Sequence, residues 1–254
     1  MNPYQRLHTI LDTLRRDCPW DREQTHLSLR YLTIEEVHEL SEAILAQQHD
    51  EVRKELGDLF LHLLFYSKIA EDEGWFTLDE VLTGICDKLL SRHPHIALPD
   101  SEGRLVGGHC EKPEWEKVKM KEGRKSVLEG VPASLPTLVK CVRMQEKAAG
   151  MGFEFPSEQE AAAKVREEQQ ELAEALAEGD RQHMEEEYGD LLFALVKWGR
   201  FHGLNADDAL ARANQKFQRR FTFVEQSARE QGRSLAELSL DEMMSLWRQA
   251  KATE

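Results

Sequence analysis

The sequence predicts an all-α protein that contains two tandem copies of one helical module. Strand signals are almost absent, because alternating runs of β-branched residues are few and no Asn-Gly or Asp-Gly hairpin turn occurs. Helix-start signals recur along the whole chain. The tetrapeptide ELGD at 55–58 returns as EYGD at 187–190, 132 residues later, and each copy runs into an apolar segment. Repetition at a fixed offset indicates duplicated modules.

Four helices are expected in the first half of the chain. Thr33 to Glu36 and Thr77 to Glu80 have the spacing of capping boxes, in which the two side chains satisfy backbone N–H groups at a helix start. Gly74 stands where a helix would stop, and 97–113 has the Gly and Pro content of a loop. The expected helices cover residues 3–16, 33–48, 50–72 and 77–93.

The second half follows the same plan after a break around 130–132. Ser157 to Glu160 has the capping-box spacing again, and Asn205 is a good N-cap residue. Gly179 and Gly203 stand at expected helix ends. The expected helices cover residues 134–149, 157–178, 180–202, 205–231 and 240–252.

The duplication extends well beyond the tetrapeptide. Acidic, aromatic and basic positions recur at an offset of 132 residues, and one basic pair recurs at 128. We therefore predict a first module at 1–120, a linker at 121–132 and a second module at 133–254. The matched positions are Glu36 and Glu39 with Glu168 and Glu171, Glu55 and Asp58 with Glu187 and Asp190, Trp115 and Lys119 with Trp247 and Lys251, and Lys88 and Arg92 with Lys216 and Arg220.

Composition narrows the class of protein. Charged residues make up 31% of the chain and hydrophobic residues 41%, which is typical of a soluble globular protein. The net charge of −14 argues against binding to duplex nucleic acid, which needs a basic face. No apolar run of about 18 residues predicts a membrane span. The N-terminus lacks a signal-peptide layout and the four cysteines form no CxxC pair, so we expect a cytoplasmic protein with reduced thiols.

The repeated acidic residues predict a metal site in each module. Residues three apart share one helix face, so Glu36 and Glu39 project together, as do Glu55 and Asp58. Two neighbouring helices would bring the pairs face to face, and four converging carboxylates repel one another unless a cation lies between them. Oxygen ligands select a hard cation, Mg²⁺ or Mn²⁺.

Acidic pairs are more often solvated helix surface, and Glu36 could also serve as the return arm of the Thr33 capping box. Three features favour the metal site. Glu36 lies only about 40° around the helix from the apolar Leu40, at about 100° per residue. Asp58 leads directly into LFLHLLFY, an apolar run typical of a buried helix, where a carboxylate needs partners. The whole arrangement also occurs twice.

Basic and aromatic residues could complete the site. Lys216 and Arg220 lie four apart, either as a solvated basic patch or as a phosphate clamp, and Lys88 and Arg92 repeat the pair. Trp247 and Trp115 are candidates for core packing or for stacking on a base. The sequence has no glycine-rich phosphate loop, so metal ions and basic side chains would have to hold any nucleotide phosphates.

Two further motifs carry weaker signals. Trp20, in CPWD at the end of the first helix, could line a base pocket or belong to a packed turn, and GFEF at 152–155 takes its place in the second module. His93 and His95 suggest a metal ligand pair, but no other His or Cys has a suitable spacing.

Together these motifs resemble the all-α nucleoside triphosphate pyrophosphohydrolases of the MazG type. The resemblance rests on EExxE, a sixteen-residue gap, ExxD running into an apolar helix, and KFxRR, and it covers nearly the whole chain. CPWDREQT, RHPH, WEKVK and GFEF are also similar to strings of that family. The resemblance implies two tandem MazG-like modules that form four-helix-bundle cores, and usually a homodimer.

The resemblance also implies an activity and a set of site residues. The activity is Mg²⁺-dependent hydrolysis of a nucleoside triphosphate to a nucleoside monophosphate and pyrophosphate, with Mn²⁺ as a substitute and a broad base range. The more C-terminal module is the one expected to be active. By motif, Glu168, Glu171, Glu187 and Asp190 would hold the metal, Lys216 and Arg220 would contact phosphates, and Trp247 and Lys251 would lie near the nucleotide.

The chemistry of the residues agrees with this hypothesis and leaves alternatives. Attack of water at the α-phosphorus needs a general base, for which Glu168 and Glu171 are equal candidates. A four-helix di-iron protein needs Glu-x-x-His twice. Glu35 and His38 have that spacing, but Gln170 stands at the second position. A non-enzymatic helical interaction protein with acidic faces is the other alternative, and the first module could be a second active site or a regulatory copy.

Overall fold

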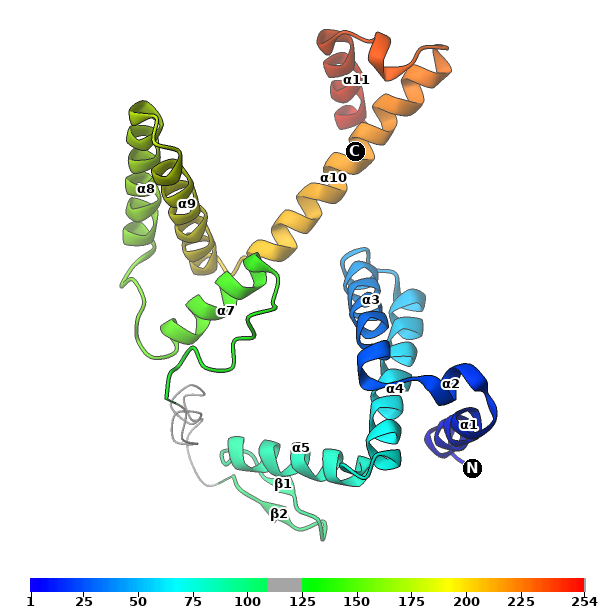
Figure 1. Cartoon of the computed structure of the whole chain (residues 1–254). Coiled ribbons are helices and arrows are strands. Elements are labelled where there is room, and N and C mark those ends of the chain that lie inside the picture. The colour runs from blue at the N-terminus through cyan, green and yellow to red at the C-terminus, as the bar shows by residue number, and fades with distance from the viewer. Residues whose placement is uncertain (109–124, 254) are drawn as a thin grey trace. The chain divides into compact units, whose positions relative to one another are not determined.

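The computed structural model describes residues 1–108 and 125–253, and it confirms the all-α fold class (Figure 1). The chain divides into two compact units, Met1–Trp115 and Glu116–Glu254. Within the described residues, helices account for all regular structure except one short antiparallel strand pair, β1 with β2. None of the described helices is both long and apolar enough to cross a membrane.

The first unit contains five described helices and the strand pair. Each expected helix is present, and a short extra helix follows the first one. The elements are α1 (Pro3–Asp17), α2 (Pro19–Glu23), α3 (His26–Leu45), α4 (His49–Asp72), α5 (Leu78–Arg92), β1 (Leu98–Pro99) and β2 (Leu105–Val106).

The predicted start of α3 at Thr33 is wrong. The helix begins at His26, because Thr25 and Ser28 form the capping box one and a half turns or more upstream. Thr33 lies inside the helix, where its hydroxyl donates to the carbonyl of Leu29 at 3.1 Å. Glu36 is therefore released from any capping role. The capping box of Thr77 with Glu80 is confirmed at the start of α5.

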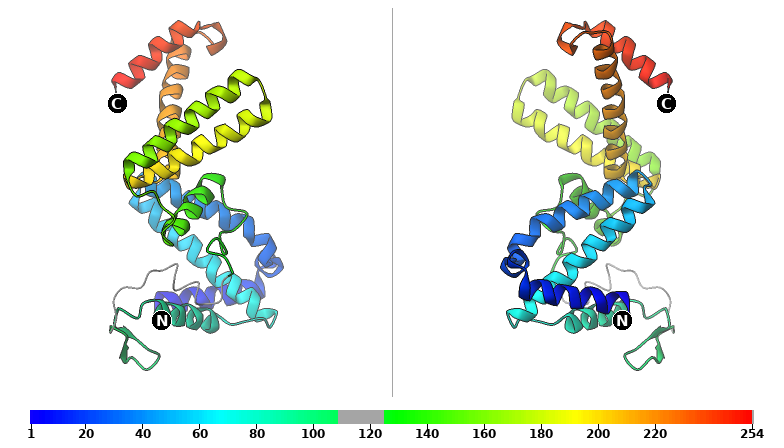
Figure 2. Two further views of the ribbon diagram at one scale, coloured as in Figure 1. Left: turned by 90° about the vertical axis from the view of Figure 1, so that its left-hand side faces the viewer. Right: turned by 90° about the vertical axis from the view of Figure 1, so that its right-hand side faces the viewer.

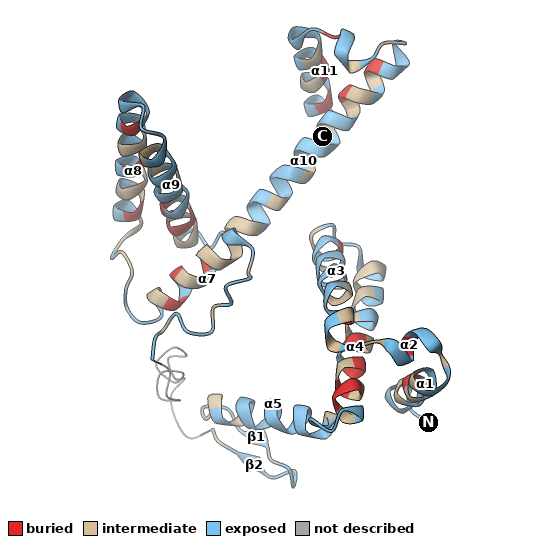
Figure 3. Ribbon diagram, in the orientation of Figure 1, coloured by how far each residue is buried: buried red, intermediate tan, exposed pale blue. Residues whose placement is uncertain are grey.

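Helices α3 and α4 form the first hairpin, the main packing pair of this unit (Figures 1 and 2). Its apolar core joins Leu29 of α3 to Leu64, Phe65 and Ile69 of α4, and α1 contributes Leu11. Figure 3 shows the buried positions of α4 concentrated in its second half, away from the acidic residues that precede them. The apolar run after Asp58 is thus the buried part of the helix, as its composition indicates.

The second unit repeats this plan with a longer C-terminal part. Ser157 and Asn205 cap their helices as expected, by accepting the backbone N–H groups of Glu160 and Asp207. Gly179 ends a helix in the left-handed conformation, at φ +79°. The elements are α7 (Thr137–Ala149), α8 (Glu158–Glu178), α9 (Arg181–Phe201), α10 (Ala206–Glu230), the 3₁₀ turn η1 (Leu235–Glu237) and α11 (Leu240–Ala252).

Helices α8 and α9 form the second hairpin, which is the counterpart of the first (Figure 1). Helix α7 packs on α9, as α1 packs on α4. Helix α10 packs against α11 and α7, with Val224 and Leu246 in the core between α10 and α11. The two hairpins are the helix pairs from which tandem four-helix-bundle cores are built, and each carries one copy of the acidic motif.

Candidate metal centres and the adjoining cavity

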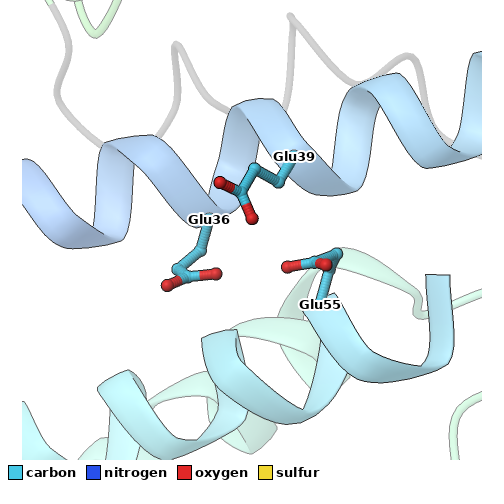
Figure 4. A group of neighbouring side chains, drawn as sticks. All are labelled: Glu36, Glu39 and Glu55. Atoms are coloured by element: carbon cyan, nitrogen blue, oxygen red, sulfur yellow. The ribbon is translucent and has the colours of Figure 1, made fainter. Parts of the chain in front are cut away.

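The first hairpin brings three glutamates together. Glu36 and Glu39 lie one turn apart on α3 and face Glu55 on α4 (Figure 4). Each offers a carboxylate oxygen, and these oxygens lie within 4.8 Å of one another. We call these three residues the first cluster. Asp58, the predicted fourth member, lies outside this 4.8 Å group, one turn along α4 and exposed.

The electrostatics of the first cluster show mutual repulsion. Burial and then the charge of Asp58 raise the pKa of Glu36. Burial and then the charge of Glu55 raise the pKa of Glu39. A raised carboxyl pKa means that the ionised form is destabilised where it stands. A divalent cation among these oxygens would relieve that repulsion.

The second hairpin repeats the arrangement. Glu168 and Glu171 on α8 face Glu187 on α9, and their carboxylate oxygens also lie within 4.8 Å of one another. We call these three residues the second cluster. Glu168 is only 6% exposed, which is rare for a carboxylate. Asp190, the predicted fourth member, again lies outside the 4.8 Å group, and it lines the cavity described below.

A lysine partly neutralises the second cluster. Lys164, one turn before Glu168 on α8, pairs with it at 2.7 Å and with Glu167 at 2.6 Å. Hydrogen bonds from these two carboxylates raise the pKa of Lys164. Burial and the charge of Glu168 raise the pKa of Glu171, while the positive charge of Lys164 opposes that rise. The first cluster has the apolar Leu32 at the matching position.

A histidine contacts the second cluster from the other side. His183, one turn before Glu187 on α9, places Nε2 3.2 Å from that carboxylate and Nδ1 3.1 Å from Glu178. The hydrogen bond to Glu178 is the main reason why the pKa of His183 is raised. This contact leaves the oxygen-rich character of the cluster unchanged, since the three grouped ligand atoms are all carboxylate oxygens.

The donor set of both clusters fits a hard divalent cation. Mg²⁺ and Mn²⁺ prefer carboxylate oxygens, and three of them within 4.8 Å of one another can reach one ion. Within the described residues, neither group of possible ligands includes His or Cys, so the donor set gives the di-iron alternative no support. His93 and His95 lie with ring centroids 5.7 Å apart and belong to neither group.

A cavity of about 330 Å³ adjoins the second cluster and shares Glu168 with it. Phe153 and Phe155 of the GFEF loop line it, together with Phe193 of α9. Its polar lining comes from both hairpin helices and from the loop. These polar residues are Glu154, Lys164, Glu168, Asp190 and Lys197.

An ion pair fastens the GFEF loop to α9. Lys197 is 8% exposed, pairs with Glu154 at 2.7 Å and lies over the rings of Phe153 and Phe155 at 5.9 and 5.6 Å. Arg200 adds a second contact to Glu154, at 3.1 Å. Burial alone would raise the pKa of Glu154, but its contacts with Lys197 and Arg200 lower it. The pair holds two aromatic rings at the rim of the cavity.

The first hairpin has apolar core at the corresponding place. Counting back 132 residues, Leu61 replaces Phe193 and Phe65 replaces Lys197. Phe65 is buried in the apolar core, and Leu32 and Leu61 pack against that core. The two hairpins therefore share the carboxylates but differ in the space behind them.

The predicted phosphate clamp lies on another pair of helices. Lys216 and Arg220 are on α10, and the Arg220 guanidinium lies 5.7 Å from the ring centroid of Trp247 on α11. Phe217 lies 5.3 Å from Trp247 and stacks on Phe221. No α10 residue belongs to the second cluster or lines the described cavity. Within this chain, α10 packs on α11 and α7 rather than on the second hairpin.

The remaining predicted residues are placed as follows. Lys88 and Arg92 lie on α5, Trp20 on the short helix α2 and Lys251 near the end of α11. Trp115 and Lys119 lie outside the described residues.

Four polar residues of the second site were missed by sequence reasoning: Glu154, Lys164, His183 and Lys197. For Lys164 and His183 a signal existed, because each stands four residues before a cluster glutamate on its helix. Lys197 and Glu154 are paired only by the fold.

Comparison with known proteins is consistent with this duplication. The profile of the MazG nucleotide pyrophosphohydrolase domain matches residues 24–97 and again 157–224. Each match contains one hairpin with its cluster. The chain is 36% identical over 263 residues to the nucleoside triphosphate pyrophosphohydrolase of Escherichia coli (strain K12), covering 100% of this chain and 99% of that protein.

Two further relatives match nearly the whole chain. The nucleoside triphosphate pyrophosphohydrolase/pyrophosphatase MazG of Thermotoga maritima is 36% identical over 253 residues, 98% of this chain and 95% of that protein. The protein YabN of Bacillus subtilis (strain 168) is 39% identical over 261 residues, 99% of this chain. The chain spans about half of YabN, 52% of its length.

Proposed function

Because the chain belongs to the MazG nucleotide pyrophosphohydrolase family, we propose that it hydrolyses nucleoside triphosphates to nucleoside monophosphates and pyrophosphate. The reaction is attack of water at the α-phosphorus, with pyrophosphate as the leaving group. Ribo- and deoxyribonucleotides of every base are substrates, and the cellular role is to remove unwanted nucleotides from the cytoplasmic pool.

One observation carries the assignment of the reaction to the second module. The second cluster lies at the edge of a cavity, whereas the place behind the first cluster is occupied by core side chains. A substrate as large as a nucleotide needs space next to the group that activates it. The second hairpin offers that space.

Glu168, Glu171 and Glu187 would hold a divalent cation, Mg²⁺ or Mn²⁺, with Asp190 one turn beyond Glu187 as a fourth ligand. When bound, the ion supplies positive charge that neutralises phosphate oxygens and favours ionisation of water. The residues of the chain then divide the remaining work. Glu168 or Glu171 accepts the proton of the attacking water.

Lys216 and Arg220 act on the leaving pyrophosphate. A guanidinium makes forked contacts with phosphate oxygens and an ammonium adds a point charge, so both stabilise the charge that develops on the leaving group. Trp247 lies against Arg220 and orients it, at 5.7 Å from guanidinium carbon to ring centroid. Lys251 follows Trp247 by one helical turn and adds positive charge near the nucleotide.

The separation of α10 from the second hairpin within one chain supports a homodimer in which the partner supplies the phosphate contacts. The second hairpin also exposes Leu176, Tyr188 and Leu192, a set of apolar side chains that a bundle partner would cover. A two-helix hairpin cannot bury both of its faces alone.

Mixing two inactive variants tests this partnership. Glu187→Gln removes a metal ligand and Arg220→Ala removes a phosphate contact, so each homodimer is inactive. After unfolding and refolding together, half of the dimers are mixed and each holds one intact site. About a quarter of the wild-type activity should return. No recovery would place the whole site within one chain.

Phosphorus NMR tests the reaction class. Purified protein is incubated with Mg²⁺ and a mixture of nucleoside triphosphates, and the phosphorus signals are followed over time. The proposal predicts nucleoside monophosphate and pyrophosphate in equal amounts, with no product once a chelator is added. Nucleoside diphosphate with orthophosphate would keep the metal site and overturn the reaction. No product from any nucleotide would favour the non-enzymatic alternative.

A further inference from the structure

The cavity beside the second cluster has no role in the chemistry at the phosphates. We propose that it is the binding site for the nucleobase of the substrate, an inference that rests on the proposed function. Its three rings come from two separate elements, the GFEF loop and α9. Rings from separate elements around one cavity form a surface on which a flat heterocycle can stack.

The charges of the cavity argue against the phosphates as its occupant. Lys164 is paired with Glu167 and Glu168, and Lys197 is paired with Glu154. Asp190 adds another negative group to the lining. The two lysines are thus already matched by carboxylates, so a polyphosphate would gain little there, whereas an uncharged base loses nothing to this field.

The position of the cavity also suits a base. Glu168 belongs to both the second cluster and the cavity lining, and Asp190 is the fourth expected ligand. A nucleotide whose α-phosphate lies at the cluster has its base one ribose away, in the space that begins at Glu168. No other cavity is needed to accommodate the rest of the substrate.

Phe153 is the residue that points most clearly to a ligand. It is 78% exposed although it is a large apolar side chain at the rim of a cavity. Gly152, at φ +89°, turns the chain just before it in a conformation that favours glycine. The ion pair of Lys197 with Glu154 then holds the loop against α9. A costly exposed ring, held in place at a cavity rim, is expected where a ligand covers it.

The first hairpin acts as an internal comparison. Its fold and its carboxylates are the same, but Leu32, Leu61 and Phe65 belong to or pack against the core where the second hairpin has Lys164, Phe193 and Lys197. The cavity is therefore not a by-product of the helix hairpin. It depends on side chains that only the second copy carries. Stacking on aromatic rings accepts every base, which agrees with a broad substrate range.

The decisive variant is Phe153→Ala, made in a chain whose first cluster is disabled by Glu55→Gln. Removing one stacked ring should raise KM for ATP, GTP, CTP and UTP by about tenfold, with kcat changed less than about twofold. Inorganic triphosphate, which has no base, serves as a competitive inhibitor, and its inhibition constant should not change. Leu204→Ala, at another exposed apolar position of the same unit, is the matched control and should leave KM unchanged.

Two results would overturn the inference. If KM for the nucleotides stays the same in Phe153→Ala, the ring does not contact the base. If the inhibition constant for triphosphate rises together with KM, the ring supports the metal centre instead. Absence of turnover in the wild-type protein would be seen before any variant is compared, and it would count against the proposed function itself.

A second variant gives a readout that does not need turnover. Phe153→Trp introduces a fluorescent ring at the rim, in addition to the five tryptophans of the chain. An α,β-methylene analogue of ATP with Mg²⁺ should quench the fluorescence of this variant more than that of the wild type, because the base stacks on the new indole. Inorganic triphosphate should cause no such difference. Equal quenching of variant and wild type by the analogue would exclude the base from this rim.

Discussion

The two hairpins carry the same three-glutamate cluster, but the space behind each cluster differs. In the first hairpin, Phe65 is buried in an apolar core that α1 completes with Leu11. In the second, the equivalent Lys197 forms an ion pair with a loop and leaves a cavity of about 330 Å³. Duplication has therefore preserved the probable ligands of a cation in both modules while only one module keeps room for an organic ligand.

The comparison teaches that the acidic motif alone does not define an active site. The EExxE and ExxD spacing places glutamates face to face in both hairpins, since it depends only on helix geometry and on the short turn between the helices. The cavity depends on which side chains stand one turn further along the same helices. We therefore assign turnover to the second module and a structural or regulatory role to the first.

The largest expected effect comes from the two basic pairs. Arg220→Ala should lower kcat/KM by about 100-fold or more, because it removes a charged donor from the leaving pyrophosphate. Arg92→Ala, its counterpart in the first module, should change kcat/KM by less than about twofold. Steady-state kinetics with ATP measures both. Equal losses in the two variants would break the comparison and give the first module an equal share of turnover.

The next effect concerns what fills the space behind each cluster. Phe65→Ala should lower the free energy of unfolding by about 3–5 kcal/mol at every pH, because it leaves a void in an apolar core. Glu154→Gln should cost about 2 kcal/mol at neutral pH, since it leaves the buried Lys197 without its partner while the remaining exposure screens part of the loss. Urea titrations measure both values.

The pH dependence separates the two cases. The pKa of Glu154 is lowered in the folded protein from its usual value of 4.5. A lowered carboxyl pKa contributes stability above that value, and the contribution is lost as the pH falls through the folded pKa. The cost of Glu154→Gln should therefore shrink at about pH 3, whereas the cost of Phe65→Ala should not change. A pH-independent cost for Glu154→Gln would mean that packing, not charge, holds the loop.

The smallest effect is that of the lysine inside the second cluster. Lys164→Leu copies the first module, where Leu32 stands at this position. The melting temperature of the metal-free protein should fall by about 2–4 °C, because the buried Glu168 loses its counter-charge while Lys164 itself is partly screened by solvent. Mg²⁺ should then raise the melting temperature of the variant more than that of the wild type.

A matched control for this variant is Lys54→Leu. Lys54 pairs with Glu51 at 2.6 Å on the surface of α4, away from the cluster glutamates' shared space. Its replacement should leave the melting temperature and the Mg²⁺ response unchanged. If Mg²⁺ stabilises Lys164→Leu no more than the wild type, the lysine and the cation do not compete for the same carboxylates.

Much of the fold could be predicted from the sequence, because helix signals are local. The caps at Thr77, Ser157 and Asn205 and the stop at Gly179 are where their residue types indicate. The start of α3 was misplaced because a threonine inside a helix can satisfy its own hydroxyl on the preceding turn, as Thr33 does on Leu29. Residue type and spacing do not distinguish that case from a cap.

The site was predictable only in part, for the same physical reason. Glutamates that share a helix face can be read from spacing, and three of the four expected carboxylates in each module do converge. Lys197 and Glu154 stand 43 positions apart and meet only through the fold. The predicted clamp on α10 is on a different helix pair from the second cluster, a separation that no helical periodicity could reveal.

The inequality of the two modules is tested most directly by disabling one metal cluster at a time. Glu55→Gln and Glu187→Gln remove the same ligand from the first and the second cluster, and both substitutions keep the shape of the side chain. Product formation from ATP with Mg²⁺ is followed by phosphorus NMR for both variants and the wild type. We predict that Glu55→Gln keeps nearly full production of AMP and pyrophosphate, while Glu187→Gln loses at least about 100-fold. Substantial turnover by Glu187→Gln, or its loss in Glu55→Gln, would contradict the account.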